Sequence, residues 1–161
     1  MAFSKSLVEI VPGDPLAYNP IATPGLVPQS PQAAEDGTVY FAASRELAEG
    51  EAAAYPIQRQ LYQQKDGVVM QLTKGDAYTS ESPMLTDNGG TLVFGRVDHS
   101  GNMSIWRIET DGSGLEKLAD LKQNVNAPEP EEGKTTEDYA ANYNDFYGRG
   151  SWNDMMAVYV R

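Results

Sequence analysis

The stretch Ser80–Ala119, SESPMLTDNGGTLVFGRVDHSGNMSIWRIETDGSGLEKLA, alternates short apolar runs with turn-forming residues. Four runs, beginning at Pro83, Thr91, Ser104 and Leu115, are separated by the turn sequences DNGG, DHSGN and DGSG. Asp, Asn and Gly accept the positive φ angles of tight hairpin turns at little steric cost. The stretch therefore predicts an antiparallel meander of four strands in roughly forty residues, the size of one propeller blade.

The order of these features resembles the TolB-type, WD-repeat-like β-propeller repeat. In that pattern Ser-Pro-Asp-Gly precedes an apolar strand, a polar turn, a strand of the Ile-Tyr-Val kind, an Asp-Gly turn and a closing Leu-Thr. The chain departs from the pattern at Met84–Asp87, where the family has Asp-Gly directly after Ser-Pro, and at Leu118-Ala119 in place of Leu-Thr. Neither departure removes a turn or a strand. The resemblance implies an all-β fold of antiparallel four-stranded propeller blades.

A second copy of the pattern opens at Ser30-Pro31 and closes at Leu72-Thr73. Asp36–Ala43 matches Gly89–Arg96 with an offset of 53 residues, Gly37 aligning with Gly90. The sequence thus predicts one blade over 30–73 and another over 80–119. The loop Arg45–Pro56 is longer than its counterpart, and its alanine and glutamate content is compatible with a helical turn.

Residues 148–161 look like the first third of a third copy, with Val158-Tyr159 aligning with Val93-Phe94. The insert over 120–147 contains Thr135 and Asp138, a pair typical of a helix start, so we expect one short helix near 136–144. Propellers close with typically four to eight blades. We therefore expect residues 30–161 to form an incomplete propeller, and we do not expect the isolated chain to be a well-folded monomer. Its neighbours would be the rest of a longer chain, other subunits, or about three copies of this chain closing a ring.

Residues 1–29 form a proline-rich extended arm before the first blade. Six of the ten prolines lie between Pro12 and Pro31, and proline cannot donate to a sheet ladder. Leu7–Val11 is compatible with one short strand. Two interpretations stay open: the arm lies over the propeller or links to another region, or it is a strap that grips another subunit.

Composition excludes several classes of partner and chemistry. The chain has 12 basic and 23 acidic residues and a formal net charge of −11, which opposes binding to nucleic acid or to an anionic membrane surface. It contains no cysteine, so disulfides and thiolate chemistry within the chain are excluded. No apolar run is long enough to insert in a membrane, and no signal peptide is visible. The family resemblance favours a periplasmic or extracellular location, although the sequence itself leaves the compartment open.

Candidate catalytic residues are sparse. The single histidine, His99, falls in a predicted hairpin turn beside Asp98, where exposure is expected. The Asp and Gly residues of the turns lack calcium-loop spacing, and no phosphate-binding glycine loop precedes a helix. We therefore predict no catalytic, cofactor-binding or metal-binding residue and no cofactor. The aromatic residues near the C-terminus form the candidate partner surface: Tyr139, Tyr143, Phe146, Tyr147 and Trp152.

Two functions fit these features. The first is a non-catalytic β-propeller segment that acts as a protein-binding or scaffold subunit and is completed by partner chains or by homo-oligomerisation. The alternative is the propeller portion of a larger enzyme, either a prolyl-oligopeptidase-like peptidase or a multi-subunit redox enzyme, with its catalytic residues elsewhere. In neither case does the chain carry the chemistry itself.

Overall fold

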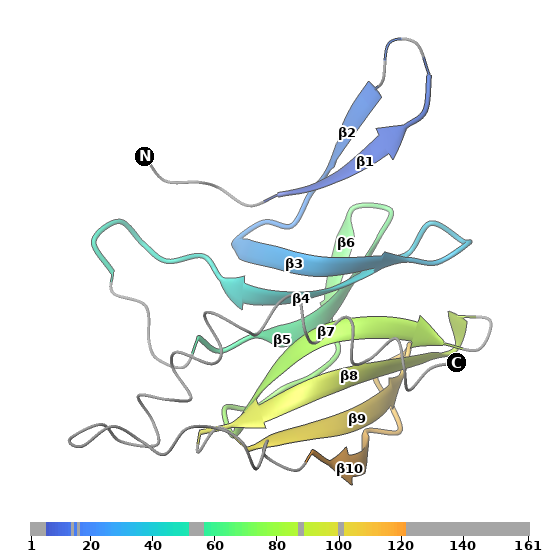
Figure 1. Ribbon diagram of the computed structural model, residues 1–161. Coiled ribbons are helices and arrows are strands. Elements are labelled where there is room, and N and C mark those ends of the chain that lie inside the picture. The colour runs from blue at the N-terminus through green and yellow to red at the C-terminus, as the bar shows by residue number, and fades with distance from the viewer. Residues whose placement is uncertain are drawn as a thin grey trace, which may run out of the picture.

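The computed structural model describes residues 6–13, 15, 17–51, 57–86, 89–99 and 102–121, which form three antiparallel sheets (Figure 1). A two-stranded hairpin precedes two sheets of four strands each. No α-helix lies in the described ranges. The strands are β1 (Leu7–Val11), β2 (Ala17–Ile21), β3 (Leu26–Ala33), β4 (Val39–Arg45), β5 (Gln60–Lys65), β6 (Val68–Gln71), β7 (Tyr78–Thr86), β8 (Thr91–Asp98), β9 (Met103–Glu109) and β10 (Glu116–Asp120).

The first blade is the sheet with strand order β3-β4-β5-β6. β5 and β6 are joined at Asp66 and Gly67, whose φ angles of 50° and 82° are the pair of positive values that a tight two-residue hairpin turn requires. The blade begins at Leu26, which pairs with Arg45, four residues before the start that the Ser-Pro motif indicates. In the long loop, the described residues 46–51 are not helical, so the helical turn considered from composition is absent there.

The second blade has strand order β10-β9-β8-β7, the same meander as the first. Phe94 of β8 pairs with Trp106 of β9, so both side chains lie on one face of this sheet. Each blade also has an irregularity in its first strand, where the register shifts between Gln29 and Gln32 and between Glu81 and Met84. The all-β fold of four-stranded antiparallel blades, predicted from the turns and apolar runs, is confirmed.

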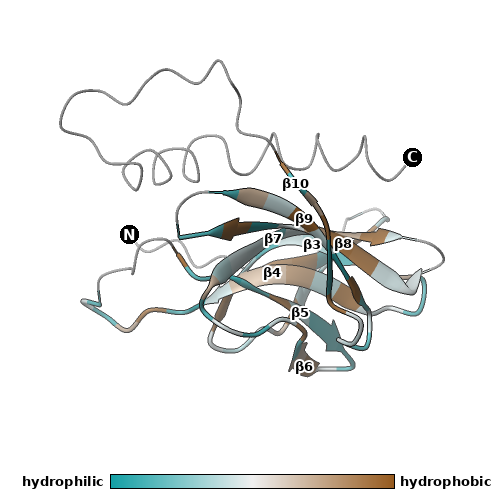
Figure 2. Ribbon diagram, turned by 90° about the horizontal axis from the view of Figure 1, so that it is seen from below, coloured by the Kyte–Doolittle hydropathy of each residue, from teal (hydrophilic) through white to brown (hydrophobic). Residues whose placement is uncertain are grey.

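The two blades pack face to face through a buried apolar cluster. The first blade contributes Tyr40, Ala42, Leu61 and Leu72, and the second contributes Leu92, Phe94 and Ile108. Alternation along β8 directs Leu92 and Phe94 to one side of the sheet. Figure 2 shows apolar segments along β4, β8 and β9, which are inner strands of the two sheets.

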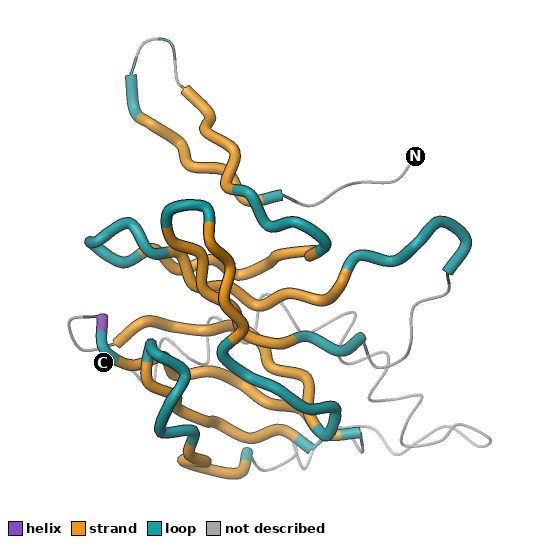
Figure 3. The backbone as a smooth tube through the Cα atoms, turned by 180° about the vertical axis from the view of Figure 1, so that it is seen from behind, coloured by secondary structure: helices purple, strands orange, loops and turns teal. Residues whose placement is uncertain are grey.

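The N-terminal region folds as a hairpin of β1 and β2, which the prolines did not reveal. Leu7 pairs with Ile21, and both pack against the face of the first blade that points away from the second. Pro20 is accommodated in β2 because this strand has no neighbour on its other side within the described residues. The rest of the hairpin stands out from the sheets (Figures 1 and 3).

Several predicted features lie outside the described residues. These are the short helix near 136–144, the partial blade over 148–161 and all of the insert beyond Leu121. The last described strand, β10, ends at Asp120, where the insert was expected to begin.

Candidate functional site

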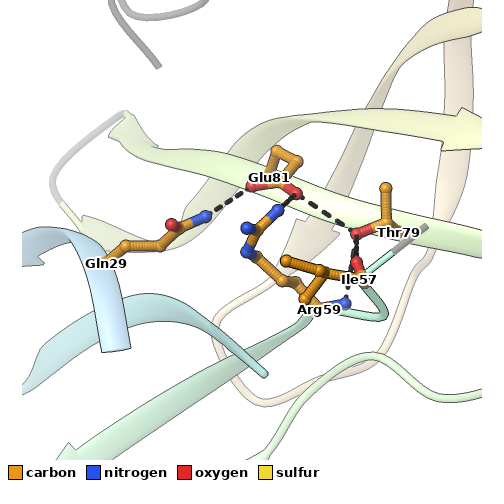
Figure 4. A network of polar contacts seen from close by, with 5 residues as sticks. All are labelled: Gln29, Ile57, Arg59, Thr79 and Glu81. Atoms are coloured by element: carbon orange, nitrogen blue, oxygen red, sulfur yellow. Dashed lines mark hydrogen bonds and ion pairs between the residues drawn. The ribbon is translucent and has the colours of Figure 1, made fainter. Parts of the chain in front are cut away.

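The contact between the two blades contains a polar network beside its apolar cluster. Glu81 of β7 accepts hydrogen bonds from Gln29 of β3 and from Arg59, which directly precedes β5 (Figure 4). Both donor-to-oxygen distances are 2.6 Å, and each donor uses a different carboxylate oxygen. The side chains of Arg59 and Glu81 are only 12% and 9% exposed. One buried carboxylate therefore joins β7 of the second blade to β3 and to the residue before β5 in the first blade.

Thr79 extends this network toward the backbone. Its hydroxyl lies 3.2 Å from Glu81 Oε1 and 3.1 Å from the carbonyl oxygen of Ile57, and it accepts the Arg59 backbone N–H at 3.1 Å. Since a hydroxyl has one proton, it donates to one of the two oxygens at a time. The network thus holds Ile57 and Arg59, just before β5, in place, and it also fixes the distance between the two blades.

The first strands of the two blades, β3 and β7, have the same local structure where they contribute to this network. Ser30 and Ser82 have φ angles of 50° and 48°, and each follows the residue that enters the network, Gln29 or Glu81. Each also precedes a proline and lies within the register shift of its strand. A bulge re-aims neighbouring side chains, and here it directs the equivalent residues of two blades toward one another.

A second group of polar contacts lies at Thr73, where the first blade ends. The Thr73 hydroxyl accepts the backbone N–H of Leu61 at 2.9 Å and donates to Gln60 Oε1 at 2.6 Å. Gln60 in turn donates to the carbonyl oxygen of Gly75 at 2.7 Å. This gives a physical reason for the closing Leu-Thr of the repeat, because the threonine satisfies a buried backbone donor.

A buried arginine lies on the face of the second blade that carries Phe94. Arg96 is 5% exposed, and its guanidinium carbon lies 4.7 Å from the ring centre of Trp106, 5.2 Å from Tyr78 and 5.6 Å from Phe94. Its Nε donates to Ser80 Oγ at 3.2 Å. Burial lowers the pKa of Arg96 from its ordinary value, and Tyr78 opposes the shift. The arginine stays charged in protein, so aromatic ring faces stabilise this buried cation.

Other candidate groups are at the surface. His99 is exposed, as expected for its turn, and its Nε2 lies 2.6 Å from the carbonyl oxygen of Asp76, to which it donates. A hollow of about 280 Å³ lies near the start of β9 and the ends of β8 and β10. Its lining is mainly polar: Tyr78, Asp98, Asn102, Met103, Ser104, Lys117, Asp120 and Leu121. Across the described ranges, no three His, Asp or Glu side chains are grouped so as to hold a metal ion.

The aromatic partner surface predicted from the sequence is not part of the described structure. Tyr139, Tyr143, Phe146, Tyr147 and Trp152 all lie beyond residue 121. The structure instead brings Gln29, Arg59 and Glu81 together, which the sequence analysis did not single out. A signal was present: Gln29-Ser30-Pro31 and Glu81-Ser82-Pro83 are matching tripeptides 52 residues apart, counted from Ser30 to Ser82.

Comparison with known proteins identifies the class of fold. No protein-family model and no curated protein matches the chain. A solved structure assigned as TolB from Agrobacterium tumefaciens is similar, with a TM-score of 0.53 and 22% sequence identity over 73% of this chain. The match covers 46% of the TolB structure, so the chain spans less than half of its length. At this identity the similarity shows the fold alone: the described blades have a TolB-like β-propeller fold. In the described part of the chain, no helix has the length and apolar character needed to cross a membrane.

Proposed function

We propose that this chain is a non-catalytic β-propeller segment that acts as a protein-binding or scaffold subunit, and that other polypeptide completes its wheel. The observation that carries the proposal is that each blade is apolar on both faces. In β4, Tyr40 and Ala42 face the second blade, whereas Val39 and Phe41 face away from it. Sheets with two apolar faces are middle layers, which require a neighbour on each side.

The second blade supports the same conclusion. Leu92 and Phe94 pack against the first blade, while Val93, Val97 and Ile105 form a cluster on the opposite face. Met84 and Met103 border this second cluster and are only partly buried. In the alignment of the two repeats Val93 corresponds to Tyr40. This face of the second blade is therefore equivalent to the face of the first blade that the second blade covers. A further blade on another polypeptide is the partner that fits it.

The polar network supports a structural role for the blade contact. Glu81 uses both carboxylate oxygens on Gln29 and Arg59, so its hydrogen-bonding capacity serves the joint between blades. A scaffold needs such a joint because its binding surfaces depend on a fixed angle between blades. We propose that the protein-binding surface lies on the faces and loops of the wheel. A location in the periplasm or outside the cell, which the resemblance of the repeats favours, is part of the same proposal.

The test is the mass and stoichiometry of the native assembly, combined with methionine oxidation. We expect the 17.5 kDa chain to be recovered in a larger complex of fixed stoichiometry. In that complex Met84 and Met103 should oxidise more slowly than in the isolated chain, because a partner blade covers them. Met70, 40% exposed on β6, serves as the control and should oxidise at similar rates in both samples. A native monomer that melts cooperatively, with Met84 and Met103 equally reactive in both samples, would overturn the proposal.

A further inference from the structure

The face of the first blade that points away from the second blade is covered by one end of the N-terminal hairpin. On this face Phe41 is fully buried and Val39 is 9% exposed. Both belong to a cluster with Leu7 of β1, and Ile21 of β2 packs against the same cluster. Leu7 is 6% exposed, whereas the next residue, Val8, is 49% exposed. We call Leu7 and Ile21 the hairpin base, because only this end of the hairpin is part of the core of the first blade.

The alignment of the two repeats shows what this face corresponds to in the second blade. With the offset of 53 residues, Val39 and Phe41 correspond to Leu92 and Phe94. Leu92 and Phe94 pack against the first blade, which precedes theirs in the chain. The hairpin base therefore occupies, on the first blade, the position that a preceding blade occupies on the second.

An aromatic pair on each of these faces supports the correspondence. Phe41 of β4 pairs with Tyr62 of β5, as Phe94 of β8 pairs with Trp106 of β9. The rings of Phe41 and Tyr62 are stacked, with their centres 5.8 Å apart. Tyr62 packs in the cluster of the hairpin base, and Trp106 packs in the cluster between the blades. Each pair thus faces the element that precedes its own blade.

A tight turn holds the hairpin base in this position. Leu26 donates its backbone N–H to the carbonyl oxygen of Thr23 at 3.1 Å, and Gly25 has a φ angle of 71°. With Pro24 at the first central position, these are the features of a type II turn. The Gly25 carbonyl oxygen accepts the backbone N–H of Glu46 at 2.8 Å, which attaches the turn to the end of β4. Because the tether between β2 and β3 is short, two apolar side chains are enough to keep the hairpin on the blade.

We propose that the hairpin base blocks the first blade, so that a neighbouring blade docks directly only on the second blade of this chain. Leu7 and Ile21 fill the space against Phe41 that a preceding blade needs, and a close-packed core cannot hold both. The polypeptide that completes the wheel then packs on the far face of the second blade, which carries Val93 and Ile105. It meets the first blade only through the hairpin.

The inference rests on the proposed function and adds to it the side on which the partner docks. Copies of the chain cannot join head to tail while the first blade is blocked, so each wheel contains one copy. Release of the hairpin base would uncover, on the first blade, a face equivalent to the one by which the second blade packs on the first. That face fits the far face of the second blade in another copy, so release should allow copies to join.

The first test counts the copies of the chain in the native assembly by native mass spectrometry. The release variant, Leu7→Asp with Ile21→Asp, puts charged groups into the apolar cluster and should detach the hairpin base. The control variant, Val8→Asp with Ile10→Asp, adds the same charge to β1 at positions that are 49% and 58% exposed. We expect one copy per wheel in the parent and control assemblies and more than one in the assembly of the release variant.

The second test follows the hairpin base itself and needs no charged substitution. The chain has no cysteine, so Leu7→Cys and Val8→Cys each carry a single thiol. In the native assembly the thiol at position 7 should be alkylated about eightfold more slowly than the thiol at position 8, in proportion to exposed fractions of 6% and 49%. Adding Ile21→Asp to Leu7→Cys should remove most of this difference, because it detaches the base.

Three results would overturn the inference. Equal alkylation at positions 7 and 8 would show that the hairpin base is not on the blade, and this comparison decides the question if the release variant is not recovered. More than one copy per wheel in the parent assembly would show that the base blocks nothing. A single copy in the assembly of the release variant would show that the uncovered face is not a blade-docking face. The proposed function is tested separately, by the protection of Met84 and Met103 on the second blade.

Discussion

Gln29 and Glu81 occupy equivalent positions in the first strands of the two blades, and their side chains meet at 2.6 Å. Both residues precede a serine with positive φ and a proline. A repeated motif has therefore become a direct contact between the repeats. The carboxylate of Glu81 and the side-chain amide of Gln29 thus join the two blades at their first strands.

Truncating Glu81 should strongly destabilise the chain. Glu81→Ala leaves Arg59, whose side chain is 12% exposed, without its carboxylate. We expect the free energy of unfolding to fall by about 3–5 kcal/mol, because a buried charge has lost its partner. Replacing both members, Arg59→Met with Glu81→Leu, should cost less than Glu81→Ala alone.

The control for this experiment is an exposed ion pair of similar length. Arg107 and Glu116 lie 2.7 Å apart, but their side chains are 48% and 56% exposed. Glu116→Ala should cost about 1 kcal/mol or less. Equal losses for Glu81→Ala and Glu116→Ala, measured by urea unfolding of the native assembly, would show that the buried network contributes no more than a surface pair.

The positive φ at Ser82 predicts an unusual order of substitutions. Glycine adopts φ near +48° without the clash of a Cβ atom, whereas a β-branched residue there is strongly disfavoured. Ser82→Gly should raise the free energy of unfolding by up to about 1 kcal/mol, and Ser82→Val should lower it by about 2 kcal/mol or more. Thermal unfolding of the native assembly would measure both.

The equivalent changes at Ser30 separate backbone strain from crowding. Ser30 has nearly the same φ but is less buried than Ser82. Ser30→Gly should therefore again be more stable than Ser30→Val. The stability lost with valine should be smaller at Ser30 than at Ser82. If valine is tolerated at Ser30 as well as glycine, crowding at Ser82 and not its backbone angle explains the first result.

Arg96 should not be replaceable by lysine. A lysine keeps the positive charge but lacks the planar guanidinium that lies over Trp106, and it places a strongly hydrated ammonium group among buried rings. We expect Arg96→Lys to lower the free energy of unfolding by about 1–2 kcal/mol. Lys117, exposed on β10, provides the control, since Lys117→Arg should change stability by less than about 0.5 kcal/mol.

Asp36 predicts a pH-dependent effect on stability. Its carboxylate forms an ion pair with Lys65 and accepts the Thr38 backbone N–H at 3.0 Å. The Lys65 ammonium, and then the backbone N–H, hold the pKa of Asp36 well below its usual range. A carboxyl group with a lowered pKa stabilises the fold above its unfolded pKa of 3.8, and that contribution is lost as the pH falls toward the folded value.

The matching experiment compares Asp36→Asn with the parent chain. Asparagine retains an oxygen for the Thr38 N–H but removes the charge. The variant should be slightly less stable than the parent at about pH 7, and the difference should shrink steadily below about pH 4. A difference that stays constant from neutral to acidic pH would contradict the assignment of the effect to the ion pair.

Much of the fold could be predicted because local sequence dictates it. Turn sequences such as Asp66-Gly67 require positive φ, and the alternation of residues in β8 requires a sheet with two faces. The sequence indicated the strand Leu7–Val11 but not its partner β2, because the prolines argue against a sheet. Pro20 is tolerated because β2 has a free edge within the described residues. The aromatic partner surface near the C-terminus lies outside the described residues and stays a prediction.

The sequence by itself determined that the chain forms antiparallel four-stranded blades, because turn chemistry and apolar alternation act over a few neighbouring residues. Only the tertiary structure decided that Gln29, Arg59 and Glu81 meet and that Arg96 lies among three aromatic rings. Gln29 and Arg59 are 30 positions apart in the sequence, and Arg59 and Glu81 are 22 positions apart. Contacts across such separations depend on how one sheet packs on the next, which no local pattern specifies.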